Sequence, residues 1–254
     1  RFFVPHDVNG MIQLFGGKEE FVAALDDIFN TDAEIHGNLV DITGLIGQYV
    51  HGNEPSHHIA YLYNYVGEPW KTQKMSRRLL NEMYHPTPEG IIGNEDCGQM
   101  SAWYILSSMG LYSVCPGSNE YVLTTPLFEK VVVHLANGRT LTILANDPQK
   151  NIYITKVELN GKQIDTNFIT YDCLMRGGEL RLPCLTSQIR AEVLLNKTAP
   201  YSYTRDKVVS IPYVDKDLNL FQGSVVVELA TTTQGAKNKV YTGRKRTDRG
   251  VIPL

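Results

Sequence analysis

Hydrophobic positions recur at three- and four-residue steps through the first 110 residues and predict a succession of helices. The apolar stripes fall at residues 8–15, 21–29, 41–49, 59–66, 69–83 and 100–109. The stripe at 41–49 is weaker because Gly44 and Gly47 lower its helix propensity. We expect these helices to form antiparallel hairpins with short connections, up to about residue 112.

The pattern changes from helical to alternating at Pro116-Gly117. Asn137-Gly138 and Asn160-Gly161 predict tight hairpin turns. Strands are predicted at 131–133, 140–144, 152–159, 180–182, 208–209 and 224–229. The last twenty residues form a polar, basic tail that we interpret as solvated.

This order of helices followed by strands indicates an α+β fold with two packed units instead of an alternating α/β sheet. We expect a helical unit over residues 1–116 and a β-rich unit packed on it over 117–195. Residues 196–254 are expected to form an accessory β-domain or an extension that carries the basic tail.

The composition is that of a globular chain: 254 residues, of which 43% are hydrophobic, suffice for one large core or two domains. A net charge of −3 from 24 basic and 27 acidic residues argues against a nucleic-acid surface, because phosphate binding requires a clustered positive field. No apolar run reaches 18 residues, so no membrane span is predicted.

The four cysteines have neither a CxxC nor a His-flanked spacing, so a zinc site has little support. Cys173 and Cys184 could pair across a hairpin. Alternatively, all four cysteines could be buried free thiols.

Two polar loops carry the candidate chemistry. The first polar loop (residues 51–58) and the second polar loop (residues 93–98) each open a helix, so they should emerge at the same end of a bundle of hairpins and converge there. Their carboxylate and amide oxygens are hard ligands, which suit calcium better than a transition metal. These donors are Asn53, Glu54, Asn94, Glu95 and Asp96.

Each of these side chains also has a structural interpretation. Glu95 or Asp96 could cap the first turn of the following helix. Trp70 and Trp103 could stack on a sugar ring, or they could lie in the core.

The imidazoles of the first polar loop are open to the same two interpretations. His51, His57 and His58 could donate hydrogen bonds to a hydroxyl-rich ligand. They could equally be interior histidines that are satisfied by the backbone.

Three segments in this order resemble glycoside hydrolase family 92, a family of calcium-dependent, exo-acting α-mannosidases. They are Phe-Val-Pro-His-Asp-Val-Asn-Gly at 3–10, His-Gly-Asn-Glu-Pro-Ser-His-His at 51–58, and Gly-Asn-Glu-Asp-Cys-Gly-Gln-Met-Ser-Ala-Trp at 93–103. The resemblance covers about residues 2–185. It implies an N-terminal β-sandwich followed by a six-hairpin (α/α)6 toroid, of which the present helices would form the closing part.

The resemblance also implies inversion by a single displacement, in which an ionised carboxylate deprotonates a water while a protonated carboxyl serves the glycosidic oxygen. Asp96 would then be the general base, with Glu95 as the competing candidate. Asn94 stands where some members carry a second acid.

By the same resemblance, Ca²⁺ would bind through Asn53 and Glu54 and hold two hydroxyls of the mannose, O2 and O3. The residues expected to contact sugar hydroxyls are His6, Asp7, His51, His57 and His58.

The family's general acid is a glutamate just ahead of the Phe-Val-Pro-His-Asp motif, and this sequence begins inside that motif. We therefore expect the isolated chain to be inactive and to require the N-terminal portion of the same protein. The substrate implied is a mannose-containing glycan such as an N-glycan, and the implied location is secreted, periplasmic or cell-surface.

Two rival interpretations stay open at this point. The chain could be a non-catalytic helical scaffold with a β-module that binds a glycan or a partner. It could also be a toroidal glycosidase that cleaves a different bond, because fold analogy does not determine the substrate.

Overall fold

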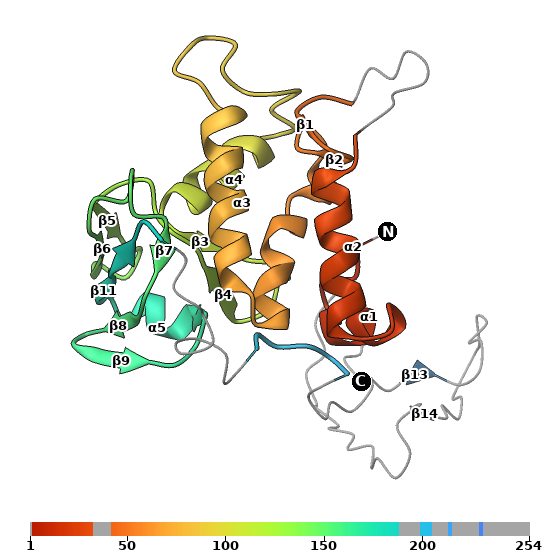
Figure 1. Cartoon of the computed structure of the whole chain (residues 1–254). Helices are drawn as coiled ribbons and strands as arrows, with labels where there is room; N and C mark the ends of the chain where they lie inside the picture. Colours follow the sequence, from red (N-terminus) through yellow and green to blue (C-terminus); the bar gives the residue numbers. More distant parts are fainter. Residues whose placement is uncertain (1, 33–41, 188–198, 205–212, 215–228, 231–254) are drawn as a thin grey trace, which may run out of the picture. The chain divides into compact units, whose positions relative to one another are not determined.

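The computed structural model describes residues 2–32, 42–187, 199–204, 213–214 and 229–230 (Figure 1). The chain divides into two compact units, Arg1–Asp206 and Lys207–Leu254. In the second unit, β13 (Tyr213–Val214) pairs with β14 (Leu229–Ala230) in antiparallel fashion. The strand predicted at 208–209, most of the strand predicted at 224–229 and the basic tail lie outside the described residues.

The first unit begins with helices, as predicted. They are α1 (Val8–Leu14), α2 (Lys18–Asn30), η1 (Glu54–Ser56), η2 (Ile59–Val66), α3 (Pro69–Glu82) and α4 (Gln99–Ser108). Pro69 occupies the first turn of α3, where its missing N–H has no intrahelical partner to lose. The segment at 59–66 is a 3-10 helix instead of the predicted α-helix. No helix in the described ranges is long and apolar enough to cross a bilayer.

The helix predicted at 41–49 is wrong. The structure has a hairpin of β1 (Leu45–Ile46) and β2 (Tyr49–Val50) there. Gly47, at the turn, has a φ of +57°, and a methyl group on it would lie 2.5 Å from the carbonyl oxygen of Ile28. The left-handed backbone and the close approach of α2 both require glycine, and together they reverse the chain instead of continuing a helix.

The β-rich part follows α4. Its strands are β3 (Leu111–Tyr112), β4 (Glu120–Leu123), β5 (Lys130–His134), β6 (Thr140–Ala145), β7 (Tyr153–Ile154), β8 (Val157–Leu159), β9 (Lys162–Ile164), β10 (Phe168–Thr170), β11 (Gly178–Leu182) and β12 (Cys184–Leu185). A short helix, α5 (Tyr171–Met175), precedes β11. The five-stranded sheet has the order β5-β6-β11-β8-β9, and its pairs are antiparallel except β6 with β11.

The turn predictions hold at both sites. Asn160 and Gly161 connect β8 to β9 with φ values of +50° and +75°, and Gly138, in the loop between β5 and β6, has a φ of +79°. The strand predicted at 152–159 is divided into β7 and β8, which pair in different sheets. The α+β class is correct.

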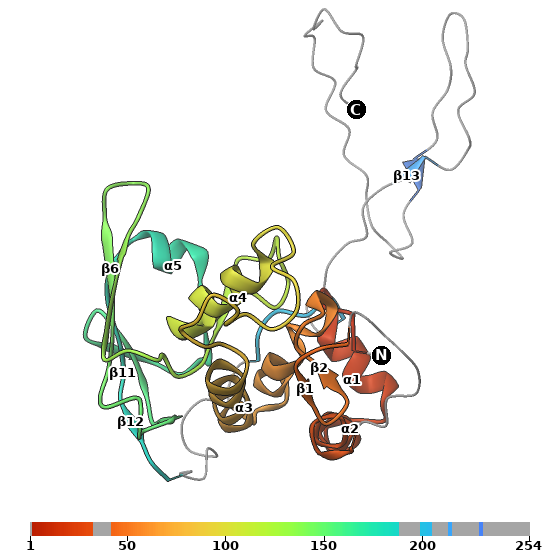
Figure 2. The same ribbon diagram turned by 90° about the horizontal axis from the view of Figure 1, so that it is seen from above.

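Two hydrophobic cores hold the first unit together. One surrounds Trp103 among the helices, and the other surrounds Leu180 in the five-stranded sheet. Figures 1 and 2 both place α3 and α4 between the five-stranded sheet on one side and α1 and α2 on the other.

The four cysteines are free thiols, so Cys173 and Cys184 do not pair. The Cys184 Sγ lies 3.0 Å from the carbonyl oxygen of Leu182 in the sheet core. Burial raises the pKa of this thiol to about 12. Cys97 is exposed, so the free-thiol alternative holds without complete burial.

Candidate functional site

The two polar loops lie against one another at their glycines. A methyl group on Gly93 would lie 2.8 Å from Thr43 Oγ1 and 3.2 Å from the carbonyl oxygen of Gly52. A second contact joins the first polar loop to the first turn of α4, where His57 Nδ1 lies 3.2 Å from Gln99 Nε2. The two loops are far apart in the sequence but pack against one another in the fold.

The first cavity opens beside this contact and has a volume of about 410 Å³. Its lining comes from all three motif segments, with Phe3 from the first, Glu54 and His58 from the second, and Gln99 from the third. The remaining lining residues are Pro5, Pro55, Tyr112, Ser113, Val114 and Pro116. Aromatic and apolar walls with a few polar groups are typical of small-ligand sites of this size.

His51 and His57 are interior side chains in this structure. The Nδ1 of His51 lies 3.0 Å from the hydroxyl of Tyr49, and its Nε2 lies 2.8 Å from the hydroxyl of Tyr84. The Nε2 of His57 lies 2.9 Å from the carbonyl oxygen of His51. Burial, with His57 beside it, lowers the pKa of His51 to about 3, so the ring is neutral at pH 7. Neither ring is among the residues that line the first cavity.

His58 differs because it lines the first cavity. Its Nε2 bonds the carbonyl oxygen of Phe2 at 2.8 Å, and its ring meets the Phe3 ring edge to face at 5.3 Å between centroids. Burial lowers its pKa. His58 therefore both holds Phe2 and Phe3 in place and lines the cavity.

His6 and Asp7 come directly after Phe3 and Pro5 in the sequence, and the carboxylate of Asp7 is bound by other groups of the protein. Its carboxylate caps α1 through the backbone N–H of Gly10 at 3.0 Å. Burial alone would raise the pKa of Asp7, but hydrogen bonds from Thr204, Ser202 and Gly10 outweigh it and lower the pKa to about 2. His6 is exposed.

The second polar loop exposes Asn94, Glu95 and Asp96. Glu95 is used as a cap: its Oε1 accepts from the backbone N–H of Ser101 at 3.0 Å and its Oε2 accepts from the Ser101 hydroxyl at 2.9 Å. Asp96 has a left-handed backbone with a φ of +48°, and its carbonyl oxygen accepts from Gln99 N at 3.2 Å. The two neighbouring carboxylates therefore have different surroundings.

The side chains of Asn53 and Glu54 are the right type of ligand for a hard cation, but they are too few to complete its coordination. Asn53 is exposed and Glu54 partly exposed, and both offer oxygen. Calcium takes six to eight oxygen ligands. The described part of the chain contains no group of three or more His, Cys, Asp or Glu side chains arranged to hold a metal ion.

The sequence left Gln99 and Thr43 unassigned, although both lie at the junction of the loops. Gln99 belongs to the third motif, which was the available signal, whereas nothing in the pattern marks Thr43. The Thr43 Oγ1 is buried without a hydrogen-bond partner. Trp103 is fully buried and donates from Nε1 to the carbonyl oxygen of His57 at 3.1 Å, so its core interpretation is the correct one. Trp70 is partly buried.

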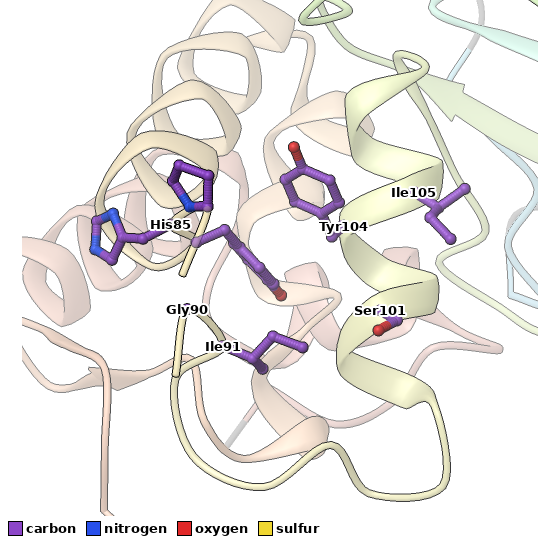
Figure 3. Close-up of a pocket in the computed structure, with 8 residues that line it drawn as sticks. His85, Gly90, Ile91, Ser101, Tyr104 and Ile105 are labelled. Carbon is purple, nitrogen blue, oxygen red and sulfur yellow. The ribbon is translucent and has the colours of Figure 1, made fainter. Parts of the chain in front are cut away.

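A second cavity of about 500 Å³ adjoins α4 (Figure 3). Its lining residues are Tyr84, His85, Pro86, Gly90, Ile91, Ser101, Tyr104 and Ile105. The Tyr84 hydroxyl is used by His51, and the Ser101 hydroxyl is used by Glu95. Both cavities are mainly apolar, and the first differs by the carboxylate of Glu54 and the amide of Gln99 in its lining.

Known proteins match this chain over the same region. The model of the glycosyl hydrolase family 92 catalytic domain matches residues 1–184. A protein described as an uncharacterized secreted glycosidase from Arthroderma benhamiae is 34% identical over 186 residues, which are 72% of this chain and 22% of that protein.

Solved structures give the same result. A family GH92 alpha-mannosidase from Bacteroides thetaiotaomicron is 40% identical, with a TM-score of 0.73 over 80% of this chain and 27% of that chain. The structure of that alpha-mannosidase in complex with mannoimidazole has a TM-score of 0.74. A family GH92 inverting mannosidase from the same organism is 38% identical, with a TM-score of 0.68 over 79% of this chain and 29% of that chain.

The chain spans between about a fifth and a third of the length of these relatives. Within that span, the family model covers most of the present sequence and includes both polar loops. The chain therefore belongs to glycosyl hydrolase family 92.

Proposed function

We propose that this chain is part of an α-mannosidase that removes terminal mannose from glycans. The observation that carries the proposal is its 40% identity to a GH92 alpha-mannosidase over 80% of its own length. The helices α1 to α4 would form the closing part of an (α/α)6 toroid, with the first cavity at the end where the two polar loops meet.

Asp96 is the residue that we propose as general base. It is exposed on the second polar loop, immediately before the turn that leads to Gln99 in the cavity wall. Glu95 is the weaker candidate because both of its carboxylate oxygens accept hydrogen bonds from Ser101. Asn94 would orient the same water through its amide.

The reaction we propose is a single displacement with inversion. The carboxylate of Asp96 takes a proton from a water that attacks the anomeric carbon, while a protonated carboxyl donates its proton to the departing oxygen on the opposite face. We propose that this donor belongs to the N-terminal portion of the same protein. The inverting mannosidase that is 38% identical supports this course.

Ca²⁺ is proposed as the cofactor, with Asn53 and Glu54 as the ligands that this chain would contribute. When bound, the ion would polarise and hold vicinal sugar hydroxyls. The oxygen chemistry of both side chains supports this assignment, and further ligands would have to complete the coordination.

The cavity also suggests which residues contact the sugar. We propose that His6, which is exposed next to Pro5 of the first cavity, contacts sugar hydroxyls. The ring of His58, whose Nε2 bonds the carbonyl oxygen of Phe2, would form part of the cavity surface that the sugar meets. For His51 and His57 we propose a positioning role, since their ring nitrogens are bound inside the protein. A secreted, periplasmic or cell-surface location is supported by the relative that is described as secreted.

The test is an assay on aryl α-mannosides and α-linked mannobioses with the 254-residue chain alone and with the whole parent protein. We expect release of mannose by the parent protein, with the β-anomer as the first product by NMR. Cleavage of α-glucosides but not α-mannosides by the parent protein would contradict the proposal.

Calcium binding has a separate readout that does not require turnover. Because a ligand that binds the native state raises the melting temperature, a chelator should lower the melting temperature of the parent protein, and added Ca²⁺ should restore it. An E54Q variant should lose most of this response. Equal melting curves with and without the chelator would exclude Ca²⁺ as a ligand.

A further inference from the structure

Residues 201–204 bind the carboxylate of Asp7 with three hydrogen bonds. Ser202 Oγ donates to Oδ1 at 2.8 Å, and the backbone N–H of Thr204 donates to the same oxygen at 3.0 Å. The hydroxyl of Thr204 donates to Oδ2. With Gly10 N also on Oδ1, both carboxylate oxygens are occupied inside the protein. Asp7 thus holds chain segments together.

The same four residues make backbone contacts on either side of Asp7. Tyr203 N donates to the carbonyl oxygen of His6 at 3.1 Å, and Ser202 Oγ accepts from Asn9 N at 2.7 Å. At the other end, Tyr201 N donates to Glu120 Oε2, on β4, at 2.6 Å. Residues 201–204 therefore span from β4 to the turn at residues 6–10.

That turn continues directly into a wall of the first cavity. The backbone N–H of Asp7 donates to the carbonyl oxygen of Val4 at 3.1 Å, which closes the turn around Pro5. Phe3 and Pro5 line the cavity, and the side chain of Phe3 is 64% exposed. His58 holds the other side of Phe3 through the carbonyl oxygen of Phe2.

We propose that residues 201–204 form a strap that positions the Phe3 and Pro5 wall of the first cavity, with Asp7 as its positioning residue. The strap lies beyond residues 1–184, which the family model matches. The hydrogen bonds themselves show that residues 201–204 hold the turn at residues 6–10. Its consequence for sugar binding rests on the proposed function.

The strap is tested with the S202A/T204A double variant of the full 254-residue chain. Losing these donors should shift the Phe3 ring resonances and speed amide exchange at Asn9 and Asp7 by roughly two- to tenfold, the factor expected for one hydrogen bond. The control is T31A, which removes the comparable exposed bond from Thr31 Oγ1 to Asp27 Oδ1 of 2.7 Å. Unchanged Phe3 resonances and Asn9 exchange in the double variant would overturn the proposal.

Titration of the parent protein with methyl α-mannoside, followed by NMR, separates the strap from the proposed function. Weaker mannoside binding in the double variant, with T31A unaffected, supports both. A shifted Phe3 ring together with a parent protein that binds no mannoside, wild type included, supports the strap and counts against the mannosidase proposal. Equal weakening by T31A and by the double variant would show a general loss of structure and would overturn the strap. A D7A variant should shift the Phe3 ring resonances as the double variant does. D7N, which keeps one acceptor oxygen, should shift them less.

Discussion

At the scale of single residues, the site depends on how the surrounding structure engages each side chain. Glu95 and Asp96 are neighbours with the same chemistry, but the first caps α4 through Ser101 and the second stands in a left-handed turn. Because a capping carboxylate is held by two donors, its substitution should affect the helix more than the reaction.

The first prediction separates these two carboxylates in the parent protein. D96N should lower kcat for an aryl α-mannoside by about 10²- to 10⁴-fold, the usual contribution of a general base, without a change in melting temperature. E95A should instead destabilise the protein by about 0.5–2 kcal/mol through loss of the cap and keep most of the activity. The reverse pattern would make Glu95 the base.

The second prediction concerns pH and the buried His51. Its pKa is about 3 in the folded chain against an ordinary value of 6.5, so the unfolded chain takes up a proton that the folded chain does not bind. The contribution of neutral His51 to the free energy of unfolding should therefore be fully present above pH 6.5 and decline as the pH falls toward 3. Burial lowers the pKa values of His57 and His58 too, which adds to the decline.

This dependence is measured by urea unfolding across the acidic range. An H51N variant should be less stable at pH 7, since the hydroxyls of Tyr49 and Tyr84 lose a partner, but its stability should fall less steeply with acidity. An unchanged slope in H51N would show that His51 does not cause the decline.

At the scale of elements, glycines decide where the sequence pattern misleads. The apolar spacing at 41–49 predicts a helix, but two left-handed glycines and the contact of Gly47 with Ile28 of α2 produce a hairpin. Long stripes such as that of α3 are correctly predicted because their burial is set by periodicity. The strap could not be predicted from the sequence, since its contacts join residues almost 200 positions apart.

The capping role of Glu95 and the interior positions of His51 and His57 were similarly open in the sequence. Each was one of two alternatives, because the residue type suits both uses. The choice depends on which hydroxyl or carbonyl the fold brings alongside, and local spacing contains no information about that. The three motif segments, in contrast, pointed correctly to the family.

The third prediction uses two glycines with the same backbone preference. Gly93 and Gly98 both have positive φ values, +74° and +92°, but a methyl group on Gly98 meets nothing within 4 Å, whereas one on Gly93 meets Thr43 and Gly52. G98A should therefore cost roughly 1 kcal/mol for the backbone alone. G93A should cost more and should also push the polar loops apart.

Thermal melts and the mannoside assay of the parent protein distinguish these effects. We expect the activity of G93A to fall further than its stability loss explains, whereas G98A should keep its activity. Equal stability and activity in the two variants would indicate that the polar loops do not need their contact at Gly93.

At the scale of the whole molecule, buried hydrogen bonds join the helical core to the sheet core in the first unit. The Gln73 Oε1 of α3 accepts from the backbone N–H of Ile154 at 3.1 Å, and Arg77 donates to the carbonyl oxygen of Pro126 at 2.6 Å. These bonds are shielded from water, so breaking one leaves an unsatisfied group. The two cores are therefore expected to unfold together.

The fourth prediction follows from this joint. Q73L should lower the free energy of unfolding by about 1–3 kcal/mol, because Ile154 N keeps no acceptor. The control is Q149A, which removes an exposed bond of 2.7 Å to the carbonyl oxygen of Leu127 and should cost less than about 0.5 kcal/mol. Tryptophan fluorescence and far-UV circular dichroism should give coincident transitions in the wild type. Separate transitions would show that the cores are independent.

The order of the five-stranded sheet has a consequence for synthesis. β11 is its last strand in the sequence but lies in the middle, between β6 and β8. A nascent chain that has left the ribosome only as far as residue 177 therefore holds two hairpins with facing, unpaired edges, and such edges promote aggregation. The next five residues, Gly178–Leu182, close the gap and protect both hairpins at once.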